Sequence, residues 1–374
     1  MSRAYLDWNA TAPLRAEARA AMIAAMDAVG NPSSVHAEGR AAKMIVETAR
    51  AQVAAAVGAM DADIVFTSGA TEAAALALAE RDLSGAAVEH DCVGAWTRGD
   101  LPVDVEGRVT TIDPANSAIQ TANSETGVIQ SLPDGLAFTD AVQAVGKVPF
   151  AFSWSGAQMA AISGHKFGGP KGVGALILRQ GLDLPAQMRG GGQEMGRRAG
   201  TENVIAIAGM GAAIAAAQAD LDTGAMDRVS ELRNILEGEL RAACPDLILM
   251  GKGAPRLPNT MCIAVPGWRG ETQVMQMDLA GYAISAGSAC SSGKVKASKV
   301  IGAMGHDDQT ASSTIRVSLG AATTEAEIMG FAAAWSRQYE KFRARAARPE
   351  TTGPASRVLA DSTENEEDRH DRIG

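Results

Sequence analysis

Short apolar runs alternate with turn residues and alanine-rich stretches through the first part of the chain. Residues 63–68 form one such run, which breaks at Gly69 and passes into the alanine-rich stretch 72–80. A buried strand, a glycine turn and a helix in this order are typical of α/β folds. Further strands are expected at residues 86–88, 117–121, 136–139, 158–162 and 173–178, and helices at 16–28 and 39–57. The pattern predicts an α/β fold with a mainly parallel sheet.

The pattern changes near residue 226. A long charged helix is expected up to residue 241, followed by strands at 247–250 and 260–265 and by a last helix at 325–346. This second part of the chain is expected to form a smaller α+β domain.

These patterns predict two domains and a tail. The large domain spans residues 16–225, and residues 1–15 and 226–348 form the small domain. Residues 349–374 are acidic and lack aromatic side chains, so they are expected to be a disordered tail.

The composition narrows the class of ligand. The 374 residues are 46% hydrophobic and 21% charged, which suffices for two packed units. The net charge is −9 and no block of lysine and arginine occurs, which argues against nucleic acid and anionic membranes as partners. The apolar stretch 204–217 is too short to span a bilayer and is expected to be a buried helix. A small-molecule ligand is therefore expected.

The cysteines and the start of the chain indicate the cellular compartment in which the protein is expected. The start has no signal-peptide pattern, and the four cysteines show no close pairing. Both features favour a cytoplasmic protein in reducing surroundings. No metal site is assigned from the sequence.

Lys166 has the most informative surroundings in the chain. It lies in the glycine-rich run 163–172, with the hydroxyl of Ser163 and the imidazole of His165 nearby. A lysine on such a turn is a candidate for a covalent Schiff base with a carbonyl compound. The alternative is a surface loop whose glycines only serve a turn, and the run alone does not exclude it.

A second glycine turn can hold a phosphate. Gly69, Ala70 and Thr71 join the strand at 63–68 to the following helix, where backbone N–H groups and the positive end of the helix dipole converge. The alternative is an ordinary turn in which Thr71 caps the helix.

Polar residues also follow or interrupt apolar runs. His90 and Asp140 each end a short run, and a carboxylate so placed can hold a protonated ring nitrogen. A lone aspartate is more often a turn former, and a lone histidine is usually structural. Arg316 lies in the strand-like run 312–320 and points opposite to its apolar neighbours. Its guanidinium suits a substrate carboxylate, and the alternative is a solvated edge-strand arginine.

Cys290 is a candidate nucleophile. It lies among serine, glycine and alanine in the run 285–293, which predicts a flexible loop with an exposed thiol. The alternative is a buried cysteine that behaves as a small hydrophobe. That interpretation is preferred for Cys92, Cys244 and Cys262, which have mixed or apolar surroundings.

Together and in this order, these motifs resemble those of the cysteine desulfurases, pyridoxal-phosphate (PLP) enzymes of aminotransferase fold type I. The run 190–194, Gly-Gly-Gly-Gln-Glu, is a further match, and the resemblance covers about residues 5–324. It implies a PLP cofactor, an obligate homodimer and a long, mobile loop around Cys290.

The resemblance also implies a role for each matching residue. Lys166 would hold PLP, Asp140 its ring nitrogen and Gln143 its phenolic oxygen, while His90 would stack on the ring and pass protons. Arg316 would bind the substrate carboxylate, and Asn31 would also contact the substrate. The residues implied at the phosphate are Gly69, Ala70, Thr71, Ser163, His165 and, across the dimer interface, Thr201.

The reaction implied is conversion of L-cysteine to L-alanine. Lys166 would take the proton from the substrate Cα, and Cys290 would receive the sulfur as a persulfide and pass it to an acceptor or scaffold protein. That sulfur would serve iron–sulfur clusters, tRNA thiolation or another cofactor. Two alternatives remain: a selenocysteine lyase or aminotransferase of the same fold, and a low-activity relative that acts as a binding partner.

The chain departs from the family pattern at two places. Ser124 stands where the family has an asparagine that contacts the phenolic oxygen of PLP, and a serine is shorter. The stretch between His90 and Asp140 is shorter by roughly a helix. A lower catalytic rate and weaker cofactor retention are the expected consequences of both departures, without a change of fold.

Overall fold

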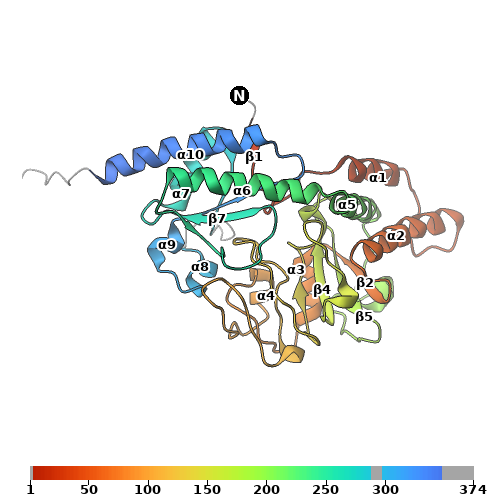
Figure 1. Cartoon of the computed structure of the whole chain (residues 1–374). Helices are drawn as coiled ribbons and strands as arrows, with labels where there is room; N and C mark the ends of the chain where they lie inside the picture. The colour runs from red at the N-terminus through yellow and green to blue at the C-terminus, as the bar shows by residue number, and fades with distance from the viewer. Residues whose placement is uncertain (1–2, 288–296, 348–374) are drawn as a thin grey trace, which may run out of the picture.

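The computed structural model describes residues 3–287 and 297–347 of the chain (Figure 1). Cys290 and the predicted acidic tail lie outside the described residues.

The large sheet contains one reversed strand. Its order is β2-β5-β4-β3, and β5 runs antiparallel to both of its neighbours, whereas β3 and β4 are parallel. Beyond β3, the expected strands at 117–121 and 86–88 are extended segments joined by single parallel bridges. The bounds are β2 Ala62–Thr67, β3 Thr139–Asp140, β4 Met159–Ser163 and β5 Gly174–Arg179. The predicted α/β class is confirmed, but this sheet is mixed, because of its three strand pairings only β3–β4 is parallel.

Helices cover both faces of this sheet. Along β2, Ile64 and Phe66 belong to one apolar core with residues of α2 and α5, whereas Val65 belongs to another core with residues of α3. This alternation is that of a strand buried on both faces. The bounds are α1 Ala16–Met26, α2 Ala37–Ala56, α3 Ala70–Leu78, α4 Asp91–Gly94 and α5 Val204–Asp222.

Helix α5 is longer than the apolar stretch 204–217 expected from the sequence, because it continues to Asp222. By length and composition alone this helix could cross a membrane. In the structure it packs against α1 and α2. Its glycines permit this packing, because a Cβ at Gly209 would lie 2.6 Å from Cγ of Met22, and one at Gly211 would lie 2.7 Å from Cα of Ala49. The expectation of a buried helix agrees with this position.

A second sheet has the antiparallel order β6-β7-β10-β9 and is covered on one face by α6 and α10, which lie side by side (Figure 1). Ile315 and Val317 of β10 share an apolar core with these helices, while Arg316 between them faces the other way. The bounds are β6 Ile248–Leu249, β7 Thr260–Ala264, β9 Ser285–Ala286, β10 Thr314–Ser318, α6 Ala225–Ala243 and α10 Glu325–Ala346.

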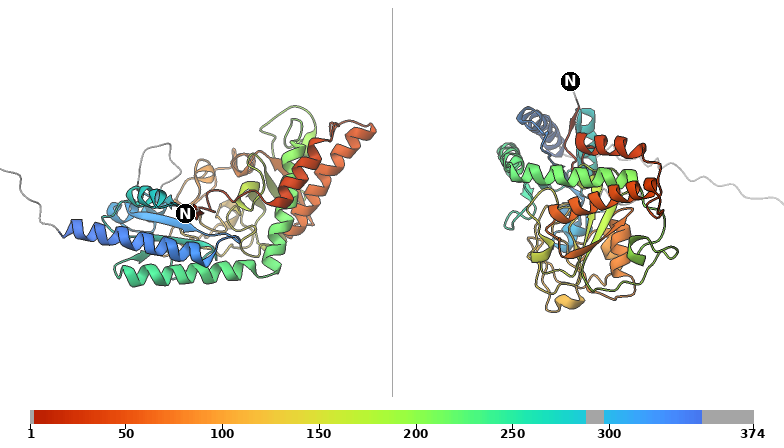
Figure 2. Two further views of the ribbon diagram at one scale, coloured as in Figure 1. Left: turned by 90° about the horizontal axis from the view of Figure 1, so that it is seen from above. Right: turned by 90° about the vertical axis from the view of Figure 1, so that its right-hand side faces the viewer.

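Three short helices and a two-stranded sheet complete the second part. The N-terminal strand β1 pairs in parallel with β8, so the first part of the chain lies beside residues about 280 positions further along it. The bounds are β1 Ala4–Tyr5, α7 Gly270–Leu279, β8 Tyr282–Ala283, α8 Lys299–Ala303 and α9 Asp308–Ser312. Helices α5 and α6 meet at a corner (Figure 2), where Gly224 has a φ of 75°. The exact domain boundaries stay a prediction.

Glu194 ties the glycine-rich run 190–194 to the large sheet. Its backbone is left-handed with a φ of 48°, and its carboxylate accepts two hydrogen bonds from Arg50, at 2.9 and 3.0 Å. It also accepts one from the N–H of Phe66 at 2.8 Å. Because Glu194 is buried, these bonds replace the water that an ionised carboxylate needs.

The substitution Glu194→Gln is expected to destabilise the fold by about 3 kcal/mol, because it leaves the Arg50 guanidinium without its buried counter-charge. Urea unfolding measures the change. Glu47→Gln is the matched control, since Glu47 contacts the same arginine at 3.1 Å from an exposed position and should cost less than about 0.5 kcal/mol. Equal losses in the two variants would contradict this account.

Candidate active site

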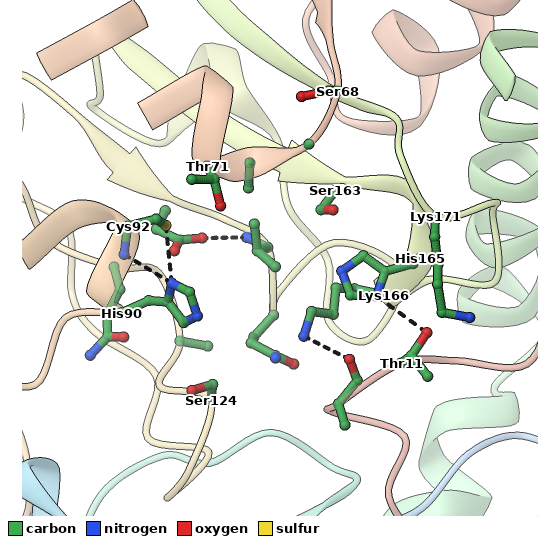
Figure 3. A pocket seen from close by; sticks show the side chains of 18 of the residues that line it. Thr11, Ser68, Thr71, His90, Cys92, Ser124, Ser163, His165, Lys166 and Lys171 are labelled. Carbon is green, nitrogen blue, oxygen red and sulfur yellow. Dashed lines mark hydrogen bonds between the residues drawn. The ribbon is translucent and has the colours of Figure 1, made fainter. Parts of the chain in front are cut away.

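A cavity of about 560 Å³ opens where strands β2, β3 and β4 end (Figure 3). It collects most of the residues predicted to hold a cofactor. They come from the β2–α3 turn, from the start of α4, from the ends of β3 and β4, and from the N-terminal segment around Thr11. The predicted residues among its lining are Gly69, Ala70, Thr71, His90, Ser124, Asp140, Gln143, Ser163, His165 and Lys166.

Lys166 reaches into the cavity from the one-turn helix η3, Gly164–Lys166, which follows β4 directly. Its Nζ donates to the backbone oxygens of Asn9, at 2.7 Å, and Ala10, at 3.1 Å. The neighbouring Gly168 has a φ of 90°, and a Cβ there would lie 2.5 Å from Cγ of Arg15. The glycines of this run therefore let the lysine loop pack against the N-terminal segment.

The end of the cavity near Thr71 and Ser163 offers hydrogen-bond donors. The first N–H groups of α3 have no partners within the helix, and Gly69, Ala70 and Thr71 at this end line the cavity. Glycine is also needed opposite this turn, because a Cβ at Gly174 would lie 2.7 Å from Cα of Gly69. The arrangement suits an anion.

His165 lies on the same side of the cavity as Lys166 (Figure 3). Its Nδ1 is 3.2 Å from the hydroxyl of Thr11. Burial first, and then the positive charges of Lys166, Lys171 and Lys147, lower the pKa of His165 to about 4. The ring is therefore neutral at pH 7.

His90 and Cys92 lie across the cavity from Lys166 (Figure 3). The N–H of Cys92 donates to Nδ1 of His90 at 3.2 Å, so a neutral His90 ring carries its proton on Nε2. Burial, followed by the charges of Asp140 and Glu89, raises the pKa of the Cys92 thiol to about 12. Cys92 lines the cavity, which its interpretation as an ordinary buried residue did not include, but its thiol stays protonated and unreactive.

Two buried carboxyl groups accompany His90. Asp140 accepts a hydrogen bond from the N–H of Val142 at 2.9 Å. Burial raises its pKa, against the opposing effects of that N–H, His90 and Lys166. Glu89 accepts one bond from the N–H of Gln120 at 2.8 Å, and its Oε2 has no partner within the described residues. Burial raises the pKa of Glu89 well above its usual value, which favours the uncharged form of this carboxyl group beside Asp140.

Ser124, not Asn123, faces the cavity. The side-chain oxygen Oδ1 of Asn123 accepts hydrogen bonds from the N–H groups of Glu125 and Thr126, at 2.9 and 2.8 Å, so this side chain organises its own loop. Ser124 lines the cavity and is labelled in Figure 3. The position that departs from the family pattern is therefore a position at the site.

Arg316 lies just behind Ser124, outside the cavity lining. Its guanidinium donates to the backbone oxygen of Ser124 at 3.1 Å and pairs with Asp7 at 2.7 Å. The buried Nε has no partner within the described residues. The Nε–H of Arg316 is thus left for a further acceptor, while Asp7 binds Nη2 of the same guanidinium group.

Thr201 and Asn31 do not line the cavity of a single chain. Thr201 lies in a neighbouring pocket of about 160 Å³, which shares Ser68 and Gly172 with the cavity. Asn31 is exposed in the loop between α1 and α2, where its side-chain oxygen accepts the N–H of Ser33 at 2.9 Å. The role of Thr201 at the cofactor of a second chain and the role of Asn31 in substrate binding stay predictions.

Sequence reasoning missed Asn9 and Lys147. Lys147 is buried, and its Nζ donates to the side-chain oxygens of Asn9, at 2.9 Å, and Gln143. Gln143 in turn donates to the backbone oxygen of Asn9 at 3.1 Å. The four-residue spacing of Gln143 and Lys147 was visible in the sequence, but nothing local pointed to Asn9.

Comparison with known proteins gives one family. The aminotransferase class-V model matches residues 4–92 and 108–331, so the interruption falls in the shortened stretch after His90. A cysteine desulfurase of Cereibacter sphaeroides is 40% identical over 88% of this chain and 93% of its own length. The cysteine desulfurase IscS of Dictyoglomus turgidum is 36% identical over 91% of this chain and 95% of its own length.

Solved structures agree with this relationship. A NifS-like protein from Rickettsia africae superposes with a TM-score of 0.82 at 30% identity, over 90% of this chain and 99% of that protein. The chain belongs to the class-V aminotransferases and, within them, to the cysteine desulfurases.

Glu125 adjoins this site and carries a perturbed carboxyl group. Its Oε2 accepts the hydroxyl of Ser298 at 2.6 Å. Removal from water raises the pKa of Glu125 to about 7, although Ser298, Arg316 and Lys299 oppose the shift and Asp91 adds to it. Because the folded protein holds this proton more tightly than the unfolded chain, stability should fall as the pH rises from about 4.5 to about 7.

Glu125→Gln should remove this loss, because glutamine keeps an acceptor for Ser298 without an ionisable group. Urea unfolding is expected to give similar stabilities for the two proteins at pH 5, and an advantage of about 2 kcal/mol for the variant at pH 8. Glu17→Gln, on the exposed face of α1, serves as the control with no pH-dependent difference. An advantage of equal size at both pH values would show that the carboxyl does not titrate in this range.

Proposed function

We propose that this chain is a PLP-dependent cysteine desulfurase that converts L-cysteine to L-alanine and leaves the sulfur as a persulfide on Cys290. The observation that carries the proposal is the cavity of about 560 Å³, in which His90 lies across from Lys166. The buried Asp140 and the N-terminus of α3 also line it. The names of the relatives, cysteine desulfurase and NifS-like protein, support the same activity.

The residues present fit the chemical groups of PLP. Thr71, Ser163 and the N-terminus of α3 offer donors for its phosphate. Burial raises the pKa of Asp140. A protonated ring nitrogen beside it would lower that pKa and favour the ionised carboxylate. Gln143 and Ser124 offer donors for a phenolic oxygen, and the Lys166 amine lies within the same cavity. When bound, PLP supplies an electron sink that lets a proton leave the substrate Cα.

The chain's own residues would carry the proton and the sulfur. Lys166 would take the Cα proton as a general base, and His90, which lies across the cavity, would pass protons. The Cys290 thiolate attacks the substrate sulfur, so an S–S bond forms, the substrate Cβ–S bond breaks and a proton takes the place of sulfur at Cβ. Overall, L-cysteine and the Cys290 thiol give L-alanine and the Cys290 persulfide.

Arg316 has a hydrogen-bond donor, Nε–H, that could bind the carboxylate of the substrate. Its buried Nε has no partner within the described residues, and a substrate carboxylate would supply the missing acceptor. A solved relative at 26% identity with a TM-score of 0.69 is described as SspA in complex with cysteine. The persulfide sulfur would pass to an acceptor protein. A cytoplasmic homodimer, with Thr201 at the partner's cofactor site and Asn31 as a substrate contact, completes the proposal.

Cys290→Ser tests the reaction. The variant is expected to bind PLP with the wild-type absorbance spectrum, because PLP binding does not use the thiol, and to form neither persulfide nor alanine from L-cysteine. Mass spectrometry of the protein and chromatography of alanine measure the two products. Cys244→Ala, in the core of the second sheet, is the control that should keep both products.

Lys166→Ala should lose both the PLP spectrum and alanine formation in the same experiment. Alanine released at the wild-type rate by the Cys290→Ser variant would favour a selenocysteine lyase or an aminotransferase. A persulfide found on Cys92 or Cys262 would overturn the role given to Cys290.

A further inference from the structure

Lys147 is a buried lysine with no part in the reaction described above. Only 6% of its surface is exposed. Its Nζ donates to two side-chain oxygens, Oδ1 of Asn9 at 2.9 Å and Oε1 of Gln143. Burial, followed by the positive charges of Lys166 and Arg316, lowers its pKa well below the usual value. Nζ is the donor in both contacts, and the two side-chain oxygens are the acceptors.

The first consequence is a fixed orientation of the Gln143 amide. With Oε1 held by Lys147, the NH2 group of Gln143 donates to the backbone oxygen of Asn9 at 3.1 Å. The opposite orientation would place two donors face to face at Lys147 and two oxygens face to face at Asn9. Since Gln143 lines the cavity, the side of the amide available to a ligand is a donor.

The second consequence concerns Lys166. The backbone oxygen of Asn9 accepts hydrogen bonds from both Gln143 and Lys166. Lys147 holds the side chain of the same asparagine. The position of the carbonyl that contacts the Lys166 amine is thus tied to Lys147.

We propose that Lys147 is a positioning residue of the cofactor site, which fixes the donor side of the Gln143 amide toward PLP and holds Asn9 against Lys166. This inference rests on the proposed function, because it assigns the ligand of Gln143 as the phenolic oxygen of PLP. Lys147 itself contacts neither cofactor nor substrate.

A methionine can replace Lys147 without crowding. The lysine lines a second cavity of about 300 Å³, whose lining includes the apolar side chains of Trp8, Leu14, Met226 and Leu319. Methionine has a similar length and no donor, so Lys147→Met removes the two hydrogen bonds and keeps the packing.

The test is a double-mutant cycle on PLP binding by the full-length protein. Lys147→Met is expected to raise the PLP dissociation constant about 5- to 10-fold, the effect of one lost hydrogen bond at the ligand, and to shift the absorbance maximum of bound PLP. In the Gln143→Ala background the same substitution should change the dissociation constant less than about twofold, because the residue through which it acts is gone. Lys252→Met, at an exposed position, should change neither quantity.

Equal losses with and without Gln143, or no loss in Lys147→Met alone, would overturn the positioning role. Failure of the wild-type protein to bind PLP would instead refute the proposed function. The Lys147–Gln143 pair is then tested by urea unfolding of the cofactor-free proteins, where the two substitutions should be non-additive by at least about fivefold in the unfolding equilibrium constant. Additive effects there would refute the pair itself.

Discussion

The structure depends on one buried asparagine, Asn9, whose hydrogen-bonding groups all have partners. Asn9 has no exposed surface, and each of its polar groups is bonded. Its side-chain NH2 donates to Ser124 and Thr260, which belong to the cavity wall and to strand β7. Because a buried amide left without partners would cost about 1–3 kcal/mol for each lost bond, the cavity wall and the second sheet are held in one arrangement. The other partners of Asn9 are Ser318, Asn259, Lys147, Gln143 and Lys166.

Burial shifts the pKa values of several groups around the cavity toward their uncharged forms. His165 and Lys147 have lowered pKa values and Glu89 a raised one, in each case mainly through burial. A shift toward uncharged neighbours would let the phosphate and the protonated ring of PLP interact with helix N–H groups and Asp140 with less competition. Ionised neighbours would compete for those contacts.

The sequence predicted the elements whose pattern is local and missed the contacts that join distant segments. The last helix was expected at 325–346 and is observed as Glu325–Ala346, because its apolar stripe and the Thr324 cap lie within the helix itself. The strands at 86–88 and 117–121 are joined only by single bridges, a feature of pairing that no local pattern records. Lys166, Asp140 and His90 were found because glycine turns and strand ends mark them. Asn9 could not be found in this way, since its partners lie more than 100 residues away along the chain.

The substitution Asn9→Asp tests most directly whether this asparagine sets the cofactor site. Aspartate keeps the shape and the Oδ1 acceptor of asparagine, but an oxygen replaces the NH2 group that donates to Ser124 and Thr260. The account predicts at least about a tenfold weaker affinity for PLP together with a lower midpoint of urea unfolding, whereas the exposed control Asn31→Asp should retain the wild-type unfolding midpoint. A destabilised variant that binds PLP as tightly as the wild type would contradict the account, because Asn9 would then hold the fold without shaping the site.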